Sequence, residues 1–337
     1  MTRYLVTRLL WLPVVLWAVA SLTFLALRLV PGNPIVFVAS QNLSAAQIER
    51  YKAEWGLDQP LWSQYGVFLA DLLRGDLGIS MSSGVPLRQL LFERMPPTIE
   101  LALVAMVIST VVGVAAGIVS SASGNRVVDY GVRTLSVLGL SVPWFWIAIL
   151  LIIVFSVKLG WTPVGGRIDA GMDYRTITNF MLVDHVITGN WDALGSFLRH
   201  LALPALAIGL TSAGFVARLT RSAMLEVLGA EYIRTARAKG IAQRTVLWRH
   251  ALRNAILPVL TLQGLQFGAL LGGAVITEIV FSWPGMGRLL LDGILRRDYP
   301  VVQGTVILVA FFYVFANLVV DLLYHVVDPR LRTGGRG

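Results

Sequence analysis

The chain has 337 residues, of which 56% are hydrophobic and 14% charged, and its mean hydropathy is +0.70. Soluble domains usually carry about 25% charged residues, so this composition excludes an ordinary soluble protein and indicates a membrane protein. Cysteine is absent, which excludes disulfides and thiolate metal sites, and the four histidines are not paired at a ligand spacing.

Apolar runs of about 20 residues recur along the chain, which is the length that an α-helix needs to cross a bilayer core. Backbone groups in hydrocarbon must bond internally, and these runs are too long and too uniformly apolar for barrel strands. The sequence therefore predicts an all-α, polytopic membrane protein with six transmembrane helices. The expected spans are residues 9–30, 101–119, 135–157, 201–216, 256–280 and 301–323.

Six spans place both termini on one side, and the basic residues indicate which side. With the N-terminus inside, the inner connections hold more Lys and Arg than the much longer outer ones. Cytoplasmic loops carry such an excess, so we expect both termini in the cytoplasm, and the net charge of +9 requires no nucleic acid. A cleaved signal peptide is disfavoured because the first run is longer than a signal core.

Two external connections are long. Residues 31–97 contain two stretches with helical periodicity, a capping-box pattern at Ser44 and Gln47, and a helix stop at Gly56, so we expect a small helical subdomain. Residues 158–200 contain Gly and Pro turns before a weakly amphipathic stretch, which predicts a less regular loop. Four carboxylates there are expected to form a solvated face: Asp169, Asp173, Asp184 and Asp192.

The large inner connection, residues 218–255, is basic and amphipathic. Gly240 interrupts its helical periodicity, which predicts two short helices joined at that glycine. Such helices either rest on anionic headgroups or form a docking surface for a cytoplasmic partner. The apolar residues of the first helix recur three or four apart, at Leu225, Leu228, Tyr232 and Ala236.

This inner connection contains "RTARAKG", then "RHALRNA" and "LP". It resembles the cytoplasmic coupling loop of ATP-binding-cassette (ABC) importer permeases, specifically the dipeptide/oligopeptide/nickel branch. The resemblance extends along the chain through "LALRLVPGNP", "ERMPPTIELAL", "LGWTPVGG", "LLGGAVITEIVFSWPGMGRLLLDGILRRDYPVVQG" and "NLVVDLLYHVVDPRLR". It implies three parts: the first span in 1–30, an external subdomain in 31–97, and a five-helix permease core in 98–337.

The resemblance also implies a place and partners. The place is a prokaryotic inner membrane, crossed several times, with both termini cytoplasmic. The partners are a homologous second permease, two cytoplasmic ATPase subunits that bind ATP and Mg²⁺, an external solute-binding protein and membrane lipid, without nucleic acid. Peptides are the implied solute, and nickel chelates or glutathione are the alternatives, since permeases for all of these share the motifs.

By the same resemblance, a short helix ending at Gly240 seats in a cleft of the ATPase. Arg234, Arg237 and Lys239 would meet acidic groups there, and Ala236 would allow close approach. The general permease signature has Glu-Ala-Ala ahead of the glycine, a pattern from which this chain and the peptide branch both depart. The expected coupling residues are Glu231, Tyr232, Arg234, Thr235, Ala236, Arg237, Lys239 and Gly240.

The chain contains no GxxxxGK[ST] motif, so we expect no ATPase site, no enzymatic activity and no cofactor in this subunit. A stand-alone proton-coupled transporter is the rival function. It would need ionisable residues near the bilayer midplane and an internal repeat, and we find no such repeat. Charges expected within spans are Arg28 and Glu278, near outer ends where interfacial or mutual pairing would explain them, and Asp321.

Small residues line one face of two spans. Gly264, Gly268 and Gly272 lie four apart in the fifth span, which permits a close helix contact. Packing within this subunit would explain such a face, and so would a contact with the second permease or with the solute pathway. The fourth span carries a similar stripe at Ala205, Gly209, Ala213 and Ala217.

Overall fold

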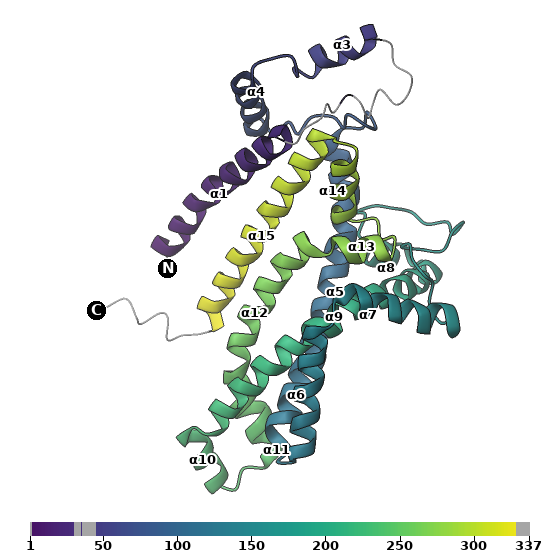
Figure 1. Cartoon of the computed structure of the whole chain (residues 1–337). Coiled ribbons are helices and arrows are strands. Elements are labelled where there is room, and N and C mark those ends of the chain that lie inside the picture. The colour runs from purple at the N-terminus through teal and green to yellow at the C-terminus, as the bar shows by residue number, and fades with distance from the viewer. Residues whose placement is uncertain (1, 30–34, 36–44, 328–337) are drawn as a thin grey trace. The chain divides into compact units, whose positions relative to one another are not determined.

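The computed structural model describes residues 2–29, 35 and 45–327, and in these ranges it contains helices and no β-strand (Figure 1). One isolated bridge joins Ile79 to Pro86. The all-α prediction is therefore confirmed. The first half of the chain forms α1 (Thr2–Leu29), α3 (Ala45–Glu54), α4 (Leu61–Leu73), α5 (Leu87–Ala122), α6 (Arg126–Ser141), α7 (Trp144–Leu151) and the π-helical η1 (Ile152–Lys158).

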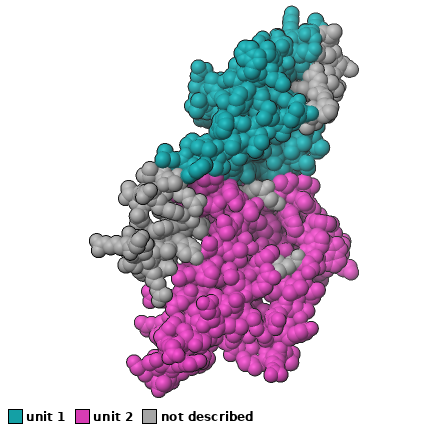
Figure 2. All heavy atoms as spheres, turned by 60° about the vertical axis from the view of Figure 1, so that its left-hand side comes forward, with its two compact units in different colours: residues 1–97, 284–312 teal, residues 98–283, 313–337 magenta. Residues whose placement is uncertain are grey.

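The second half continues with a long helix and several short ones. It forms α8 (Met181–Thr188), α9 (Trp191–Leu228), α10 (Glu231–Ala238), α11 (Gln243–Thr245), the π-helical η2 (Val246–Ala251), α12 (Leu252–Gly273), α13 (Val275–Val280), α14 (Met286–Leu295) and α15 (Tyr299–Val327). Contacts divide the chain into unit 1, residues 1–97 with 284–312, and unit 2, residues 98–283 with 313–337 (Figure 2). The expected three-part division stays a prediction.

Four helices among the described residues are long and apolar enough to cross a membrane: α1, α5, α9 and α15. A fifth span results if α6 and the α7–η1 pair are counted together. The expected number of six is therefore not confirmed, since α12, which occupies the position of the fifth predicted span, is not among the candidate spans found in the described residues.

The third predicted span is not a straight helix. A bend of 100° separates residues 126–139 from 144–158. Val142 is extended, with φ −87° and ψ 129°, and Pro143 follows it. Proline disfavours the helical conformation of the preceding residue and supplies no amide hydrogen for the helix. The prediction of one continuous helix over residues 135–157 was therefore wrong at residues 142–143.

Unit 1 holds the two short helices that the sequence predicted in residues 31–97. Both periodic stretches are helical, as α3 and α4, and Gly56 ends the first with φ +61°. Its amide donates to Ala53 O, and the Leu57 amide donates to Lys52 O, the two bonds of a Schellman cap. The predicted Ser44 cap lies outside the described residues. The Gly56 prediction is confirmed.

A buried core joins the remaining parts of unit 1. Leu87 and Leu91 of α5 pack with Met286 of α14 and Val301 of α15. Beside this core, the buried Asp298 carboxylate accepts hydrogen bonds from Ser80 Oγ at 2.6 Å and from the Ser82 amide at 2.9 Å. These bonds fix the turn around residues 79–86 to the start of α15.

In unit 2, α5 and α9 pack at close range. A Cβ on Gly209 would lie 2.8 Å from Ile108 Cβ, and one on Gly113 would lie 2.5 Å from Val216 Cβ. A Cβ on Gly117 would lie 2.5 Å from Thr220 Cβ. Side chains at these positions would therefore force the helices apart. The small stripe of the fourth span thus has an explanation as packing within this chain.

The second segment that we expect outside the cell is irregular over residues 159–180, as predicted, and then forms α8. Arg167 donates to Glu100 and to Asn179 O. The prediction that Asp184 belongs to a solvated face was wrong, because this residue is 1% exposed. Its carboxylate accepts hydrogen bonds from the Thr178 hydroxyl at 2.6 Å and from the Ile177 amide at 3.0 Å. The sequence pattern did not reveal that the turn before α8 folds back onto this carboxylate.

Two neighbouring groups here have shifted pKa values. Burial would raise the pKa of Asp184, but hydrogen bonds from Thr178, Ile177 and Asn179 outweigh burial and hold that pKa below its ordinary value. Burial lowers the pKa of His185, against the effect of the Asp184 carboxylate and with that of Arg167. His185 is fully buried among rings, with centroids 5.8 Å from Tyr174 and 6.4 Å from Phe197. It therefore favours the neutral form in the fold.

The pKa of His185 predicts a loss of stability in acid. As the pH falls below the ordinary histidine value of 6.5, the unfolded chain takes up a proton that folded His185 binds less readily. The midpoint of thermal unfolding should therefore fall between pH 7 and pH 5, and His185→Phe, which keeps the ring packing, should reduce this fall. Because the pKa of Asp184 lies below its ordinary value of 3.8, protonation of this carboxylate reduces stability only at a lower pH than this range. An unchanged pH dependence in His185→Phe would contradict the assignment.

Candidate functional site

The basic inner connection forms a projecting end of unit 2. At 1.5 Å per residue, the 38 residues of α9 measure about 57 Å, whereas a hydrocarbon core is about 30 Å thick. The helix therefore extends beyond any bilayer that it crosses. At its end, Gly229 and Ala230 break the helix, and α10 follows at the same end of the unit as α11 (Figure 1).

One face of α10 is buried. Ile233 is fully buried and Ala236 is 7% exposed, in a core that also contains Met224 of α9, Val246 of η2 and Ala255 of α12. This core holds α10 across the ends of three helical segments. The hydroxyl of Tyr232 adds a further tie, because it accepts a hydrogen bond from Asn254 Nδ2 at 2.7 Å. A helix of eight residues would not be stable alone, so this packing sets its position.

Gly240 ends α10, as the sequence predicted. Its φ of +74° lies in the left-handed region, its amide donates to Arg237 O, and the Ile241 amide donates to Ala236 O. These two bonds form a Schellman cap. A Cβ on Gly240 would have open space around it within this chain. Within the subunit, the glycine is therefore required by backbone conformation and not by close packing.

The other face of α10 is exposed and basic. Glu231, Arg234, Arg237 and Lys239 are all exposed. Arg234 Nη1 lies 3.6 Å from Glu231 Oε1, but both side chains are solvent-exposed and such a pair contributes little stability. The face therefore presents an excess of positive charge on a rigid support, and Thr235 lies on it as well. This arrangement suits a partner surface that carries carboxylates.

Seven of the eight expected coupling residues are exposed, and Ala236 is the exception. The side chain of Ala236 faces the core of this subunit, and its close approach to a partner stays a prediction. The predicted apolar face is correct for Leu228 and Ala236, which pack in this core, and wrong for Leu225 and Tyr232. Leu225 and Tyr232 are 43% and 44% exposed, whereas Met224 and Ile233 are buried. The break at Gly229 changes the direction in which the side chains of α10 point relative to those of α9. The prediction assumed one uninterrupted helix over these residues and so did not include this change.

The sequence analysis did not predict a charged cluster near the C-terminal end of α9. Arg221 Nε donates to Asp129 Oδ1 at 2.6 Å and its Nη2 donates to Oδ2 at 2.9 Å, a two-pronged pair between α9 and α6. Ser120 of α5 also donates to Asp129. The sequence contained one signal, an acidic residue in the first turn of a basic helix, but Arg221 was explained by topology alone.

The glycine face of α12 is partly covered by this chain. Gly264 and Gly268 are buried, and a Cβ on Gly268 would lie 2.7 Å from Tyr313 Cδ2 of α15. Packing within the subunit therefore accounts for Gly268. The surroundings of Gly272 lie outside the described residues. A role of this face in contacting a second permease or in lining the pathway stays a prediction.

The charged residues in the spans have local partners. The buried Glu278 carboxylate accepts a hydrogen bond from Thr98 Oγ1 at 2.6 Å in unit 2. In unit 1, Arg28 Nε donates to Gln64 Oε1 at 2.9 Å, and its guanidinium carbon lies 3.5 Å from the Phe24 ring centroid. The side chain of Asp321 lies outside the described residues. No group of three or more His, Asp or Glu suited to a metal ion occurs among the residues described.

Comparison with known proteins assigns the chain to a family. Residues 109–333 match the family described as "Binding-protein-dependent transport system inner membrane component", and residues 1–102 match the corresponding N-terminal family. The chain belongs to this family. It is therefore the membrane component of an ABC importer, as the resemblance implied, and the rival of a stand-alone proton-coupled transporter is rejected.

Curated relatives align over nearly the whole chain. It is 45% identical over 320 residues to the di/tripeptide transport system permease protein DppB of Pseudomonas aeruginosa, with 94% of each chain covered. It is 42% identical over 332 residues to the dipeptide permease DppB of Alkalihalophilus pseudofirmus, covering 98% of this chain and 100% of that protein. It is 44% identical over 321 residues to DppB of Escherichia coli, covering 93% and 94%.

Solved structures support the fold. An inward-facing structure of the MetNI methionine ABC transporter has a TM-score of 0.54 at 18% identity, covering 72% of this chain and 98% of that chain. A second inward-facing structure of the same transporter has a TM-score of 0.53 at 17% identity, with the same coverage. At these identities the likeness concerns the fold alone, which is that of an importer permease.

The packing of α10 can be tested directly. Ile233→Ala should cost about 2–5 kcal/mol of local stability, because it leaves a cavity beneath the helix. Trypsin should then cleave faster after Arg234, Arg237 and Lys239, as peptide mass spectrometry would show. Thr235→Ala, on the exposed face, is the control and should leave cleavage unchanged. Equal rates in the two variants would show that Ile233 does not anchor α10.

Proposed function

We propose that this chain is the permease subunit of an importer that brings short peptides into a prokaryotic cell. The observation that carries the proposal is 42–45% identity over 93–98% of the chain to three permeases described as dipeptide or di/tripeptide transport proteins. Nickel chelates and glutathione are the alternative solutes. Uptake measurements with each solute separate them.

The proposed assembly follows from the family. A second homologous permease, two cytoplasmic ATPase subunits and an external solute-binding protein complete it. The ATPase subunits bind ATP and Mg²⁺, and this chain holds no cofactor. The exposed basic face of α10 supports the view that α10 docks on an ATPase. Glu231, Tyr232, Arg234, Thr235, Arg237, Lys239 and Gly240 would form the docking face, with Ala236 supporting it from within the subunit.

Coupling through α10 requires a rigid link to the membrane helices. The core around Ile233 and the Asp129–Arg221 pair both supply one. A push on α10 would then be transmitted to α9, and through α9 to α5 and α6. We place both termini and α10 in the cytoplasm, and α3, α4 and α8 outside the cell, because the basic residues are concentrated in the shorter connections.

Reconstituted vesicles test the function and its coupling together. The complete assembly should take up a radiolabelled dipeptide only with internal ATP and the binding protein, and a proton gradient should not replace ATP. Gly240→Val should reduce uptake and stimulated ATP hydrolysis about 5- to 30-fold. The reason is that a non-glycine residue in the left-handed backbone conformation of Gly240 destabilises that conformation by about 1–2 kcal/mol.

Gly189→Val is the matched control. Gly189 also follows an eight-residue helix and has φ +67°, and a Cβ added to it would have open space around it. This variant carries the same backbone strain on the proposed outer side and should retain ATPase coupling. Normal uptake by Gly240→Val would reject α10 as the coupling element, and preferential uptake of a nickel chelate would reject peptides as the solute.

The orientation has its own test. Ser83 and Ser222 are exposed and lie on opposite sides of the membrane in our assignment. In intact cells, Ser83→Cys should react with an impermeant thiol reagent, whereas Ser222→Cys should react only after the cells are opened. The parent contains no cysteine, so labelling is site-specific. Labelling of Ser222→Cys from outside would invert the topology.

A further inference from the structure

Unit 1 contains a large pocket that the coupling function does not use. Its volume is about 950 Å³, at the upper end of the range for small-molecule sites. The walls come from α1, α4, the turn around residues 74–86 and the start of α15. All of these segments belong to unit 1, so the pocket forms within one compact part of the chain.

Two buried hydrogen-bond donors in the wall have no partner among the described residues. Gln303 is 7% exposed and its Nε2 is unbonded, and Nη1 of Arg28 is likewise unbonded. Leaving such donors unsatisfied is costly, so buried donors nearly always have an acceptor. Both residues line the pocket, and a small rotation of either side chain would bring its donor to the carboxylate of a ligand.

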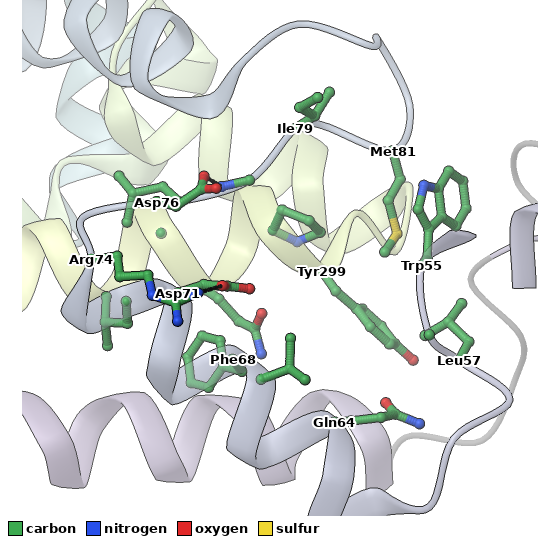
Figure 3. A pocket seen from close by; sticks show the side chains of 18 of the residues that line it. Trp55, Leu57, Gln64, Phe68, Asp71, Arg74, Asp76, Ile79, Met81 and Tyr299 are labelled. Carbon is green, nitrogen blue, oxygen red and sulfur yellow. Dashed lines mark hydrogen bonds and ion pairs between the residues drawn. The ribbon is translucent and has the colours of Figure 1, made fainter. Parts of the chain in front are cut away.

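The pocket also presents negative charge and apolar surface. Asp71 and Asp76 line it together with Arg74, and Figure 3 shows these three side chains on one side of the pocket. Trp55 and Met81 lie on the other side in the same view, and Tyr299 lies between the two groups. Arg28 and Arg88 also line the pocket, so its walls carry both signs of charge and suit a ligand that has both an ammonium and a carboxylate group.

Asp71 retains free capacity to accept hydrogen bonds. The nearest cationic atom recorded for its carboxylate is Arg74 Nη1, at 4.0 Å, which is too far for a hydrogen bond, and the Asp71 side chain is 44% exposed. The carboxylate of Asp76, by contrast, already accepts from the Gly78 amide at 2.9 Å. Asp71 is therefore the better placed of the two to receive the ammonium group of a ligand.

We propose that this pocket binds a short peptide by its free ends. Gln303 and Arg28 bind the terminal carboxylate, Asp71 binds the terminal ammonium, and Trp55, Met81 and Tyr299 contact an apolar side chain. The proposal rests on the proposed function for its solute class. It adds to that function a solute site within unit 1 of this subunit. A zwitterionic lipid headgroup shares part of this chemistry, and the experiment distinguishes the two sources.

Equilibrium dialysis of the full chain in phosphatidylcholine nanodiscs tests the proposal. Tritiated Ala-Leu-Ala should bind, and its N-acetylated, C-amidated form should not compete. Gln303→Leu should weaken binding at least about tenfold, the loss expected for one hydrogen bond to a charged group. Gln89→Leu is the control, because Gln89 is exposed on α5 and does not line the pocket.

Asp71→Asn gives a second, independent readout. It should weaken binding of the free tripeptide but not of the N-acetylated acid, which has no ammonium group. Equal effects of Asp71→Asn on both ligands, or none of Gln303→Leu, would overturn the proposal. So would the absence of binding in phosphatidylcholine, or loss of tripeptide binding when phosphatidylethanolamine is added to the nanodiscs, which would assign the pocket to the lipid.

This test is separate from transport. Peptide uptake by the complete assembly, with no tripeptide binding by this chain, would reject the pocket and leave the proposed function intact. Tripeptide binding by the chain, with no peptide uptake by the assembly, would reject the proposed function and leave the pocket as a peptide site of another purpose.

Discussion

Backbone amide and carbonyl groups find no water inside a bilayer, so a chain that crosses it must bond them within its own helices. This constraint explains the long helices α1, α5, α9 and α15. It also makes each interruption informative, because a break leaves backbone groups to be satisfied elsewhere. The breaks at Pro143 and at Gly229 to Gly240 divide what would otherwise be simple rods. The second of these breaks forms the projecting basic end of unit 2.

The physical link between the two faces of the proposed transporter is α9. This helix begins at Trp191, close in sequence to the buried Asp184 and His185, and ends beside the core that holds Ile233. Glycines bring α5 within close range of it, and the Asp129–Arg221 pair joins it to α6. A helix clamped in this way can move as a unit with α10, which is the mechanical property that coupling to an ATPase requires.

The candidate site could be predicted in part. A local pattern was sufficient for the ends of α10 and α3, since Gly240 and Gly56 both adopt left-handed φ values at helix caps. Local pattern failed for Leu225 and Tyr232, which it placed on the apolar face although both are exposed, because the direction of a side chain depends on the rotation introduced at Gly229. It also missed Asp129 and Arg221, which lie 92 residues apart in the chain.

The sequence by itself determined the properties that depend on composition and short-range order: membrane insertion, helical class, the basic inner connection and the family motifs. Tertiary structure alone decided which carboxylates are buried, which face of α10 is free, and that segments distant in sequence enclose a pocket lined by Arg28, Asp71 and Gln303. The physical reason is the range of the interactions. Helix formation and partition into lipid are set by neighbours within a few turns, whereas burial and hydrogen bonding depend on residues brought together by folding.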